Sequence, residues 1–110
     1  MKLGENIIIP TAKITQYLLI YREQDDKSKF LAQAGFTLTN PEQLKSAIIQ
    51  LTKDYDAIED KVNEYGIFYQ VSGELKGINN YNLSVITIWL KRKIDDQIQF
   101  ITLKPKKEKK

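Results

Sequence analysis

The sequence contains neither cysteine nor histidine. Without cysteine there is no disulfide framework, no thiol nucleophile and no zinc ribbon. Without histidine there are no Ser-His-Asp or Cys-His triads, no histidine-based metal sites and no two-histidine ribonuclease chemistry. These absences leave either an enzyme that works through Lys, Tyr, Thr, Asp or Glu, or a module that only binds.

Long hydrophobic runs are missing as well. The N-terminal segment has only three consecutive isoleucines before Pro10, far fewer than the core of a signal peptide. The longest later apolar runs, Tyr17–Tyr21 and Val85–Leu90, are too short for a bilayer, which takes roughly 20 residues. We therefore expect a cytoplasmic protein that does not contact membranes.

The length of 110 residues fits one globular domain, and the 42% share of hydrophobic residues is ordinary for such a domain. The net charge of +3 is uneven, because Lys104 to Lys110 carry five lysines against one glutamate, or +4, and residues 1–103 therefore sum to −1. We expect a single domain over residues 1–103 and a disordered, lysine-rich tail over residues 104–110, which either binds a polyanion or only solubilises the chain. Three tail residues are candidates for nucleic-acid contacts: Lys104, Lys106 and Lys107.

Helical spacing dominates the first half of the chain. Apolar residues between Ala12 and Tyr21 recur at the i, i+3, i+4, i+7 positions of one helical face. A second short helix is predicted over about Lys27 to Ala34, with Gly35 placed to end it. Asn40-Pro41 is a strong start signal for a third helix, with Asn40 as its cap and Pro41 at the first helical position, and we expect this helix to end near Lys53.

Strand-like patterns replace helical ones in the second half. Val85–Leu90 is rich in β-branched and aromatic residues and is predicted as a central strand. Short loops joining the strands favour an antiparallel meander, and the helices must then cover one face of it. The predicted fold class is α+β, with about three N-terminal helices packed on a four-stranded sheet. The four strands are predicted over about 57–65, 67–75, 83–90 and 97–103.

Motifs for metals and nucleotide cofactors are absent. Acidic pairs such as Asp25-Asp26 and Asp95-Asp96 fall in predicted turns, where carboxylates are usually solvated caps. There is no EF-hand spacing and no glycine-rich phosphate loop. The sequence therefore predicts no metal site and no cofactor.

Aromatic side chains are crowded in the half of the chain that contains the predicted strands. On an exposed sheet face beside lysines, they would form the stacking platforms that single-strand nucleic-acid binders use. If that face is covered instead, the same residues belong to the core. The aromatic residues concerned are Tyr65, Phe68, Tyr69, Tyr81, Trp89 and Phe100.

A ribonuclease without histidine is chemically feasible. When the 2′-OH of RNA attacks its own phosphate, the phosphorane charge must be neutralised and the leaving oxygen protonated. Lysine supplies positive charge, while tyrosine and threonine position hydroxyl groups. Such an enzyme would depend on electrostatics and substrate positioning rather than on a strong base.

A series of short motifs also extends over nearly the whole chain. They are Ile9-Pro10, Lys13, Tyr17-Leu18-Leu19, Lys27, Phe30, Gly35-Phe36, Asn40-Pro41-Glu42-Gln43-Leu44, Tyr65-Gly66, Tyr69, Val85, Thr87, Trp89, Phe100, Thr102 and Pro105. This series resembles a small uncharacterised bacterial domain family that is common in cyanobacteria. The family in turn looks related to the barnase–EndoU–colicin–RelE ribonuclease toxin fold, in which N-terminal helices pack on a four-stranded antiparallel sheet.

The resemblance implies an active surface on the sheet, with added groups from the helices. On the hypothesis of a ribonuclease, Lys13 and Lys27 neutralise the scissile phosphate, and Tyr69 and Thr102 position or donate protons. Structural alternatives remain, since threonine is a good strand former and tryptophan commonly fills cores. The matching positions are Lys13, Lys27, Tyr69, Thr87 and Thr102 as catalytic candidates and Trp89 as a nucleic-acid contact.

Two hypotheses follow. The first is a small ribonuclease-like toxin, or toxin-derived domain, that cleaves RNA without metal and is held in check by a neighbouring antitoxin or immunity-like protein. The second is a non-catalytic interaction module of the same fold, which binds a protein partner or nucleic acid. The ribonuclease hypothesis requires that its candidate residues converge on one surface. Oligomeric state stays open.

Overall fold

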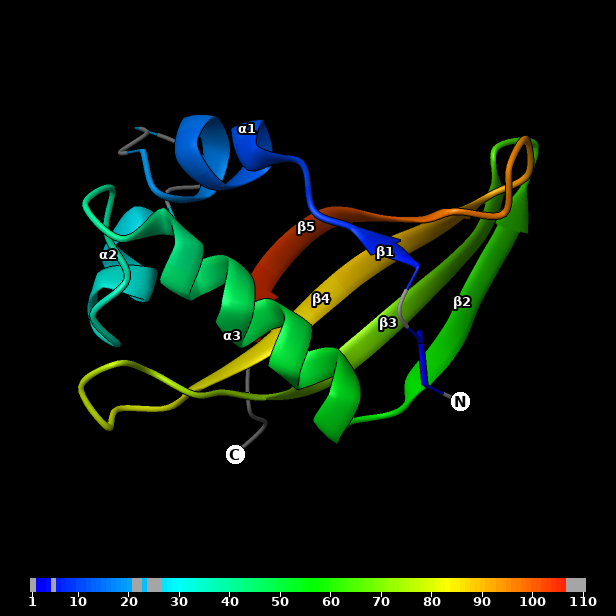
Figure 1. The fold of residues 1–110 in the computed structure, drawn as a ribbon. Coiled ribbons are helices and arrows are strands. Elements are labelled where there is room, and N and C mark those ends of the chain that lie inside the picture. The colour runs from blue at the N-terminus through cyan, green and yellow to red at the C-terminus, as the bar shows by residue number, and fades with distance from the viewer. Residues whose placement is uncertain (1, 5, 21–22, 24–26, 107–110) are drawn as a thin grey trace.

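Helical segments come first in the chain and a twisted sheet follows (Figure 1). The structure, a computed structural model, describes residues 2–4, 6–20, 23 and 27–106. Helix α3 lies across one face of the sheet, and the other helical segments gather at one end of it (Figure 1). The elements in chain order are β1 (Ile7–Ile8), α1 (Thr11–Lys13), η1 (Ile14–Leu18), α2 (Ser28–Ala32), α3 (Pro41–Asp54), β2 (Ala57–Asn63), β3 (Gly66–Leu75), β4 (Leu83–Arg92) and β5 (Ile98–Pro105).

The first predicted helix is a short α-helical turn, α1, that continues into a π-helix, η1. The wider π-turn is marked by the Leu19 N–H, which donates to the Ile14 carbonyl at 3.0 Å. Apolar spacing predicts a helix here but does not distinguish the two types, because residues four apart, such as Ile14 and Leu18, lie near one face in both and η1 is only five residues long. The predicted end at Tyr21 lies outside the described residues.

The second and third helices begin and end close to the predicted positions. Gly35 follows α2 with a φ of 90°, a left-handed conformation that suits glycine at a helix end. α3 begins at Pro41 directly after Asn40. The Asn40 side chain makes no bond to α3. Instead its Nδ2 donates to the Gly35 carbonyl at 3.0 Å and its Oδ1 accepts from the Thr37 N–H at 2.9 Å. Asn40 thus fastens the α2–α3 loop rather than capping α3 through its side chain.

The sheet has five strands in the order β1-β5-β4-β3-β2. The predicted count of four is wrong, although the α+β class and the antiparallel meander of β2 to β5 are correct. The additional strand, β1, is two residues long and pairs parallel to β5, with Ile7 beside Ile98 and Ile8 beside Gln99. Two residues carry no periodicity of their own, so only the folded β5 edge makes them a strand.

Alternate residues of the sheet face α3 and form the core. Val71, Thr87 and Leu103 are cross-strand partners and all three are fully buried. Trp89 is also fully buried and meets Phe100 edge-to-face, with ring centroids 5.3 Å apart. Removing these side chains from water is the main stabilisation of the domain. Helix α3 contributes further buried residues: Leu44, Ile48 and Leu51.

The intervening residues point to the opposite face of the sheet, which we call the far face. Cross-strand partners share a face, so the strand register places whole rows of side chains together. Two such rows of half-buried residues are Gln70, Ile88 and Thr102, and Phe68, Leu90 and Gln99.

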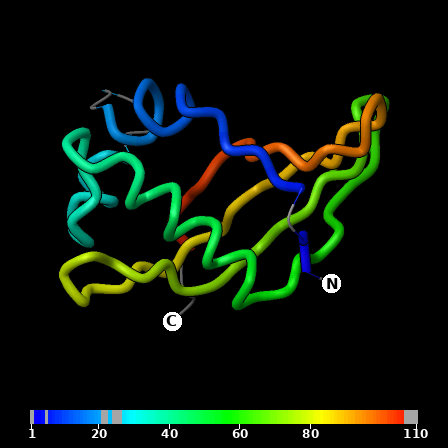
Figure 2. The backbone as a smooth tube through the Cα atoms, viewed as in Figure 1, coloured from blue at the N-terminus to red at the C-terminus, as the bar shows by residue number. Residues whose placement is uncertain are grey.

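The turns between β2 and β3 and between β4 and β5 lie together at one end of the sheet, beyond the helices (Figure 2). The Lys93 N–H donates to the Tyr65 carbonyl at 3.0 Å and so ties the two turns. Gly66 permits this approach. It has a φ of 143°, and a Cβ added to it would collide with the Lys91 carbonyl.

Strand β5 continues to Pro105, and the Lys106 N–H donates to the Ser84 carbonyl at 2.9 Å. The strand therefore runs into the segment that the sequence assigns to a tail. The rest of that segment, 107–110, lies outside the described residues. Of the helices in the described ranges, none has the length and apolar character needed to cross a membrane.

Candidate functional site

Three polar side chains from distant parts of the chain meet at the edge of the sheet. The Lys27 ammonium donates to the Tyr17 hydroxyl at 2.9 Å and to the Thr102 hydroxyl at 3.0 Å. The two hydroxyl oxygens lie 3.4 Å apart. All three side chains are half-buried. We call this group the lysine–hydroxyl cluster.

Each residue of the cluster comes from an irregular or terminal part of its element. Tyr17 belongs to the π-helix η1, and Lys27 directly precedes α2. Thr102 follows a β-bulge, because the register shifts between Ile88 and Trp89 on the partner strand. π-helical turns and β-bulges are both enriched at functional sites, where they re-aim side chains.

Thr102 lies on an open part of the sheet edge, since β1 covers β5 only at Ile98 and Gln99. Its register partner Ile88 belongs to the far face. The cluster therefore adjoins the far face, and it is approached from the edge by η1 and the start of α2.

The cluster carries concentrated positive charge. The ammonium groups of Lys27 and Lys13 lie 4.9 Å and 5.6 Å from the centre of the Tyr17 ring. Such cation–π contacts hold two charges beside one aromatic ring. The cluster can therefore bind an anion and offer it hydroxyl hydrogen bonds.

Ion pairs between described residues lie elsewhere. Lys76 is 3.9 Å from Asp54, and Arg92 is 3.4 Å from Asp95. Lys2 is 3.3 Å from Asp56, and its hydrogen bond and charge lower the pKa of that carboxyl below its usual range. None of these pairs between described residues engages the two lysines beside the Tyr17 ring.

Three other catalytic or binding candidates lie in the core instead. The Thr87 hydroxyl donates to the Val71 carbonyl at 3.0 Å and accepts from the Trp89 indole N–H at 2.8 Å, and both side chains are fully buried. Tyr69 is only 8% exposed and pairs with Trp89 across the strands. These three side chains are buried in the core, where RNA has no access, so we do not assign them to the site.

The tail lysines are placed differently. Lys104 is exposed and pairs with Ile86 on the far face, two residues beyond Thr102 on β5. Lys106 is exposed just after the strand, and Lys107 lies outside the described residues. Lys104 thus adds charge near the cluster.

Tyr17 is the functional candidate that the sequence patterns did not single out. It occurs in a motif of the resemblance and on the apolar face of the first helix, a position typical of a core residue. Its contact with Thr102 spans 85 positions, so no local pattern indicates it. The i, i+4 spacing of Lys13 and Tyr17 was the available signal.

A metal-binding cluster of side chains is absent from the part of the chain that the structure describes. No group of three acidic side chains there is arranged to hold an ion.

Comparisons with known proteins give the family of this chain and a solved structure of similar fold. The family model described as "Domain of unknown function (DUF6883)" matches residues 2–107. A solved structure described as "Contact-dependent growth inhibition toxin - immunity protein complex from Klebsiella pneumoniae 342" contains a chain with a TM-score of 0.69 and 18% identity. The match covers 89% of this chain and 98% of that one. At this identity the likeness shows the fold alone, and it does not distinguish the toxin from the immunity protein. No curated protein matches the sequence.

Proposed function

We propose that this chain, which belongs to the DUF6883 family of domains of unknown function, is a small toxin-like domain that cleaves RNA without a metal ion. The observation that supports the proposal is the lysine–hydroxyl cluster, in which Lys27 lies 2.9 Å from the Tyr17 hydroxyl and 3.0 Å from that of Thr102. A phosphodiester fits this arrangement, because phosphate oxygens accept from ammonium and hydroxyl donors.

The proposed reaction is an attack of the RNA's own 2′ oxygen on the adjacent phosphorus. The O2′–P bond forms, the P–O5′ bond breaks, and the products are a 2′,3′-cyclic phosphate and a 5′-hydroxyl. The 2′-OH proton leaves to water, because the chain has no histidine to take it. A proton from the cluster goes to the departing 5′ oxygen and is replaced from water.

The roles of the side chains follow from charge and position. Lys27 and Lys13 neutralise the phosphorane, which carries more negative charge than the starting phosphodiester. The Tyr17 and Thr102 hydroxyls accept from the Lys27 ammonium, and this polarisation makes them better donors to the reacting phosphate. Transition-state stabilisation of this kind gives slow turnover compared with a true acid–base pair.

A dedicated inhibitor protein is part of the proposal. The neighbour of similar fold comes from a complex of a toxin with its immunity protein. A cell that makes an RNA-cleaving domain needs such a partner, and we propose that one is encoded beside this chain. Binding of that partner near the cluster would exclude RNA.

The test compares Lys27→Met with Lys53→Met, a matched loss of one charge at an exposed position of α3. Purified proteins are incubated with synthetic RNA and EDTA, and products are separated by length. We expect wild type and Lys53→Met to cleave, and Lys27→Met to lose about 100-fold or more of the rate. If all three proteins leave the RNA intact, the ribonuclease function is wrong.

The competing function is a non-catalytic module that binds a protein partner. It is favoured by the edge strand β2, where Ile58 and Val62 are 70% and 64% exposed. Under this alternative, Ile58→Asp would abolish complex formation with the adjacent gene product, and Lys27→Met would have no effect on any measured activity.

A further inference from the structure

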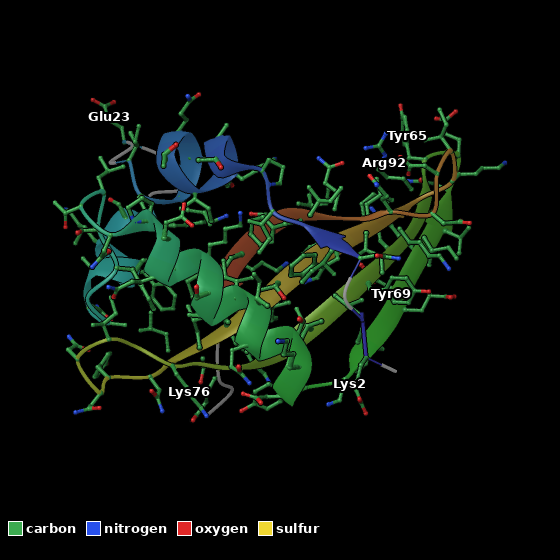
Figure 3. All side chains as sticks on the ribbon, viewed as in Figure 1. Lys2, Glu23, Tyr65, Tyr69, Lys76 and Arg92 are labelled. Atoms are coloured by element: carbon green, nitrogen blue, oxygen red, sulfur yellow. The ribbon has the colours of Figure 1, made fainter. Side chains whose placement is uncertain are left out.

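A pocket of about 400 Å³ opens where the two hairpin turns meet, at the end of the sheet beyond the helices. Leu90 and Gln99 form its floor and belong to the far face. Figure 3 shows Tyr65 and Arg92 together at this end of the molecule. The remaining lining residues are Glu64, Lys93 and Ile94.

Backbone hydrogen bonds hold the walls of this pocket in place. The Lys93 N–H donates to the Tyr65 carbonyl at 3.0 Å, which joins one wall to the other. The Arg92 N–H donates to the Gln97 carbonyl at 2.8 Å and closes the β4–β5 turn. The cavity is therefore formed before any ligand arrives, which reduces the entropy lost on binding.

The lining suits a flat, heteroaromatic ring attached to an anion. The Tyr65 side chain is 65% exposed and offers a ring for stacking, while Leu90 and Ile94 supply apolar walls. The Gln99 amide can donate to and accept from the edge of a base. Lys93 and Arg92 supply positive charge for a phosphate, against one carboxylate in the lining, that of Glu64, and Arg92 also pairs with Asp95 at 3.4 Å.

The pocket and the lysine–hydroxyl cluster lie along the same strand and adjoin the same face. Gln99 and Thr102 flank the β-bulge of β5 and pair with Leu90 and Ile88, which are two positions apart on β4, a separation of about 7 Å in an extended strand. Between them, Ile88 and Leu90 line the far face on β4. Lys61 adds a further charge there, with its ammonium 5.0 Å from the centre of the Phe68 ring. Neighbouring nucleotides of one single strand can reach both places.

We propose that this hairpin-end pocket binds a nucleobase of the single-stranded RNA whose scissile phosphate occupies the cluster. The proposal rests on the function proposed above and adds to it a second contact that sets the minimum substrate length. The volume of about 400 Å³ is in the range of small-molecule pockets and accommodates a base together with its ribose. A protein partner is a poorer occupant, because a stable protein interface takes roughly 800 Å² on each partner.

The test measures binding and cleavage separately. Binding is followed by fluorescence anisotropy with a labelled 2′-O-methyl RNA octanucleotide, which cannot be cleaved because its 2′ oxygen is blocked. The variant is Tyr65→Ala, and the matched control is Tyr81→Ala, which removes a similarly exposed tyrosine, 52% accessible, from the β3–β4 loop. Both positions are outside the core, so both variants should fold.

We expect Tyr65→Ala to weaken the Kd for the octanucleotide about 10-fold, the usual effect of losing one stacked base, and Tyr81→Ala to leave it unchanged. Cleavage of the unmodified octanucleotide at low concentration should slow by a similar factor in Tyr65→Ala and stay at the wild-type rate in Tyr81→Ala. An octanucleotide Kd that is equal in Tyr65→Ala and wild type overturns the pocket and leaves RNA cleavage standing. Tyr65-dependent binding without any cleavage supports the pocket and overturns the ribonuclease function. No binding by wild type overturns both.

Discussion

Thr87 and Thr102 lie on neighbouring strands and have opposite surroundings. Thr87 is fully buried under α3, where its hydroxyl joins the Val71 carbonyl to the Trp89 indole. Thr102 lies at the sheet edge, where its hydroxyl accepts from Lys27. The same side chain therefore completes the core in one place and an ammonium-centred cluster in the other. Hydrogen bonds between neutral groups in a core stabilise the fold, whereas a charged group with hydroxyls at an edge is available for a ligand.

The largest effect should come from the core side of this comparison. Trp89→Ala removes a fully buried indole and leaves a cavity beside Phe100, so we expect the free energy of unfolding to fall by about 3–5 kcal/mol. Urea denaturation followed by circular dichroism measures the change. Ile94→Ala, at a position 84% exposed, is the control and should shift stability by less than about 0.5 kcal/mol. A stable Trp89→Ala protein would mean that this face is not the core.

The two threonines can be exchanged for valine to separate fold from function. Thr87→Val removes the hydroxyl that bonds to both the Val71 carbonyl and the Trp89 N–H in the buried core. Because these groups then lose a buried hydrogen-bond partner, we expect the free energy of unfolding to fall by about 1–3 kcal/mol. Thr102→Val should leave stability nearly unchanged and lower RNA cleavage about 10-fold. Equal stability losses in the two variants would show that Thr102 is only structural.

A smaller effect is expected from Tyr17→Phe, which keeps the ring beneath both lysines but removes the hydroxyl that bonds to Lys27. The RNA Kd should stay constant while the cleavage rate falls several-fold, because the hydroxyl acts mainly on the transition state. Single-turnover kinetics distinguish the two quantities. A weaker Kd with an unchanged rate would assign Tyr17 to ground-state binding instead.

The smallest effect concerns the exposed lysines near the C-terminal end of β5. Lys104→Ala combined with Lys106→Ala should weaken RNA binding only a few-fold. It should lower the slope of log K against log salt concentration by about 1–2, because each lysine that no longer neutralises a phosphate leaves one counterion in place. Titrations at several salt concentrations give this slope. An unchanged slope would place the RNA path away from Lys104.

Much of the fold was predictable from local patterns. Asn40-Pro41 marked the start of α3, and the β-branched run Val85–Leu90 lies within the central strand β4. The π-helical turn and the two-residue strand β1 were not predictable. η1 shares its apolar spacing with an α-helix, and β1 exists only because the β5 edge is there to pair with it.

The candidate site was predictable in part. The resemblance pointed to Lys13, Lys27 and Thr102, which the fold brings together around Tyr17. It pointed equally to Tyr69, Thr87 and Trp89, which the fold buries. Both sets occupy strands or helix ends with similar local composition, so sequence pattern alone could not rank them.

By itself the sequence determined the α+β class and limited any chemistry to lysine, hydroxyl and carboxyl groups, since it has no histidine and no cysteine. Tertiary structure alone decided which hydroxyls meet which lysines. Neighbouring strand residues point to opposite faces, so docking α3 on one face buries Thr87, and the β5 register turns Thr102 away from it. The contact between Tyr17 and Thr102 joins positions 85 residues apart, and only the packing of η1 against the open edge of β5 creates it.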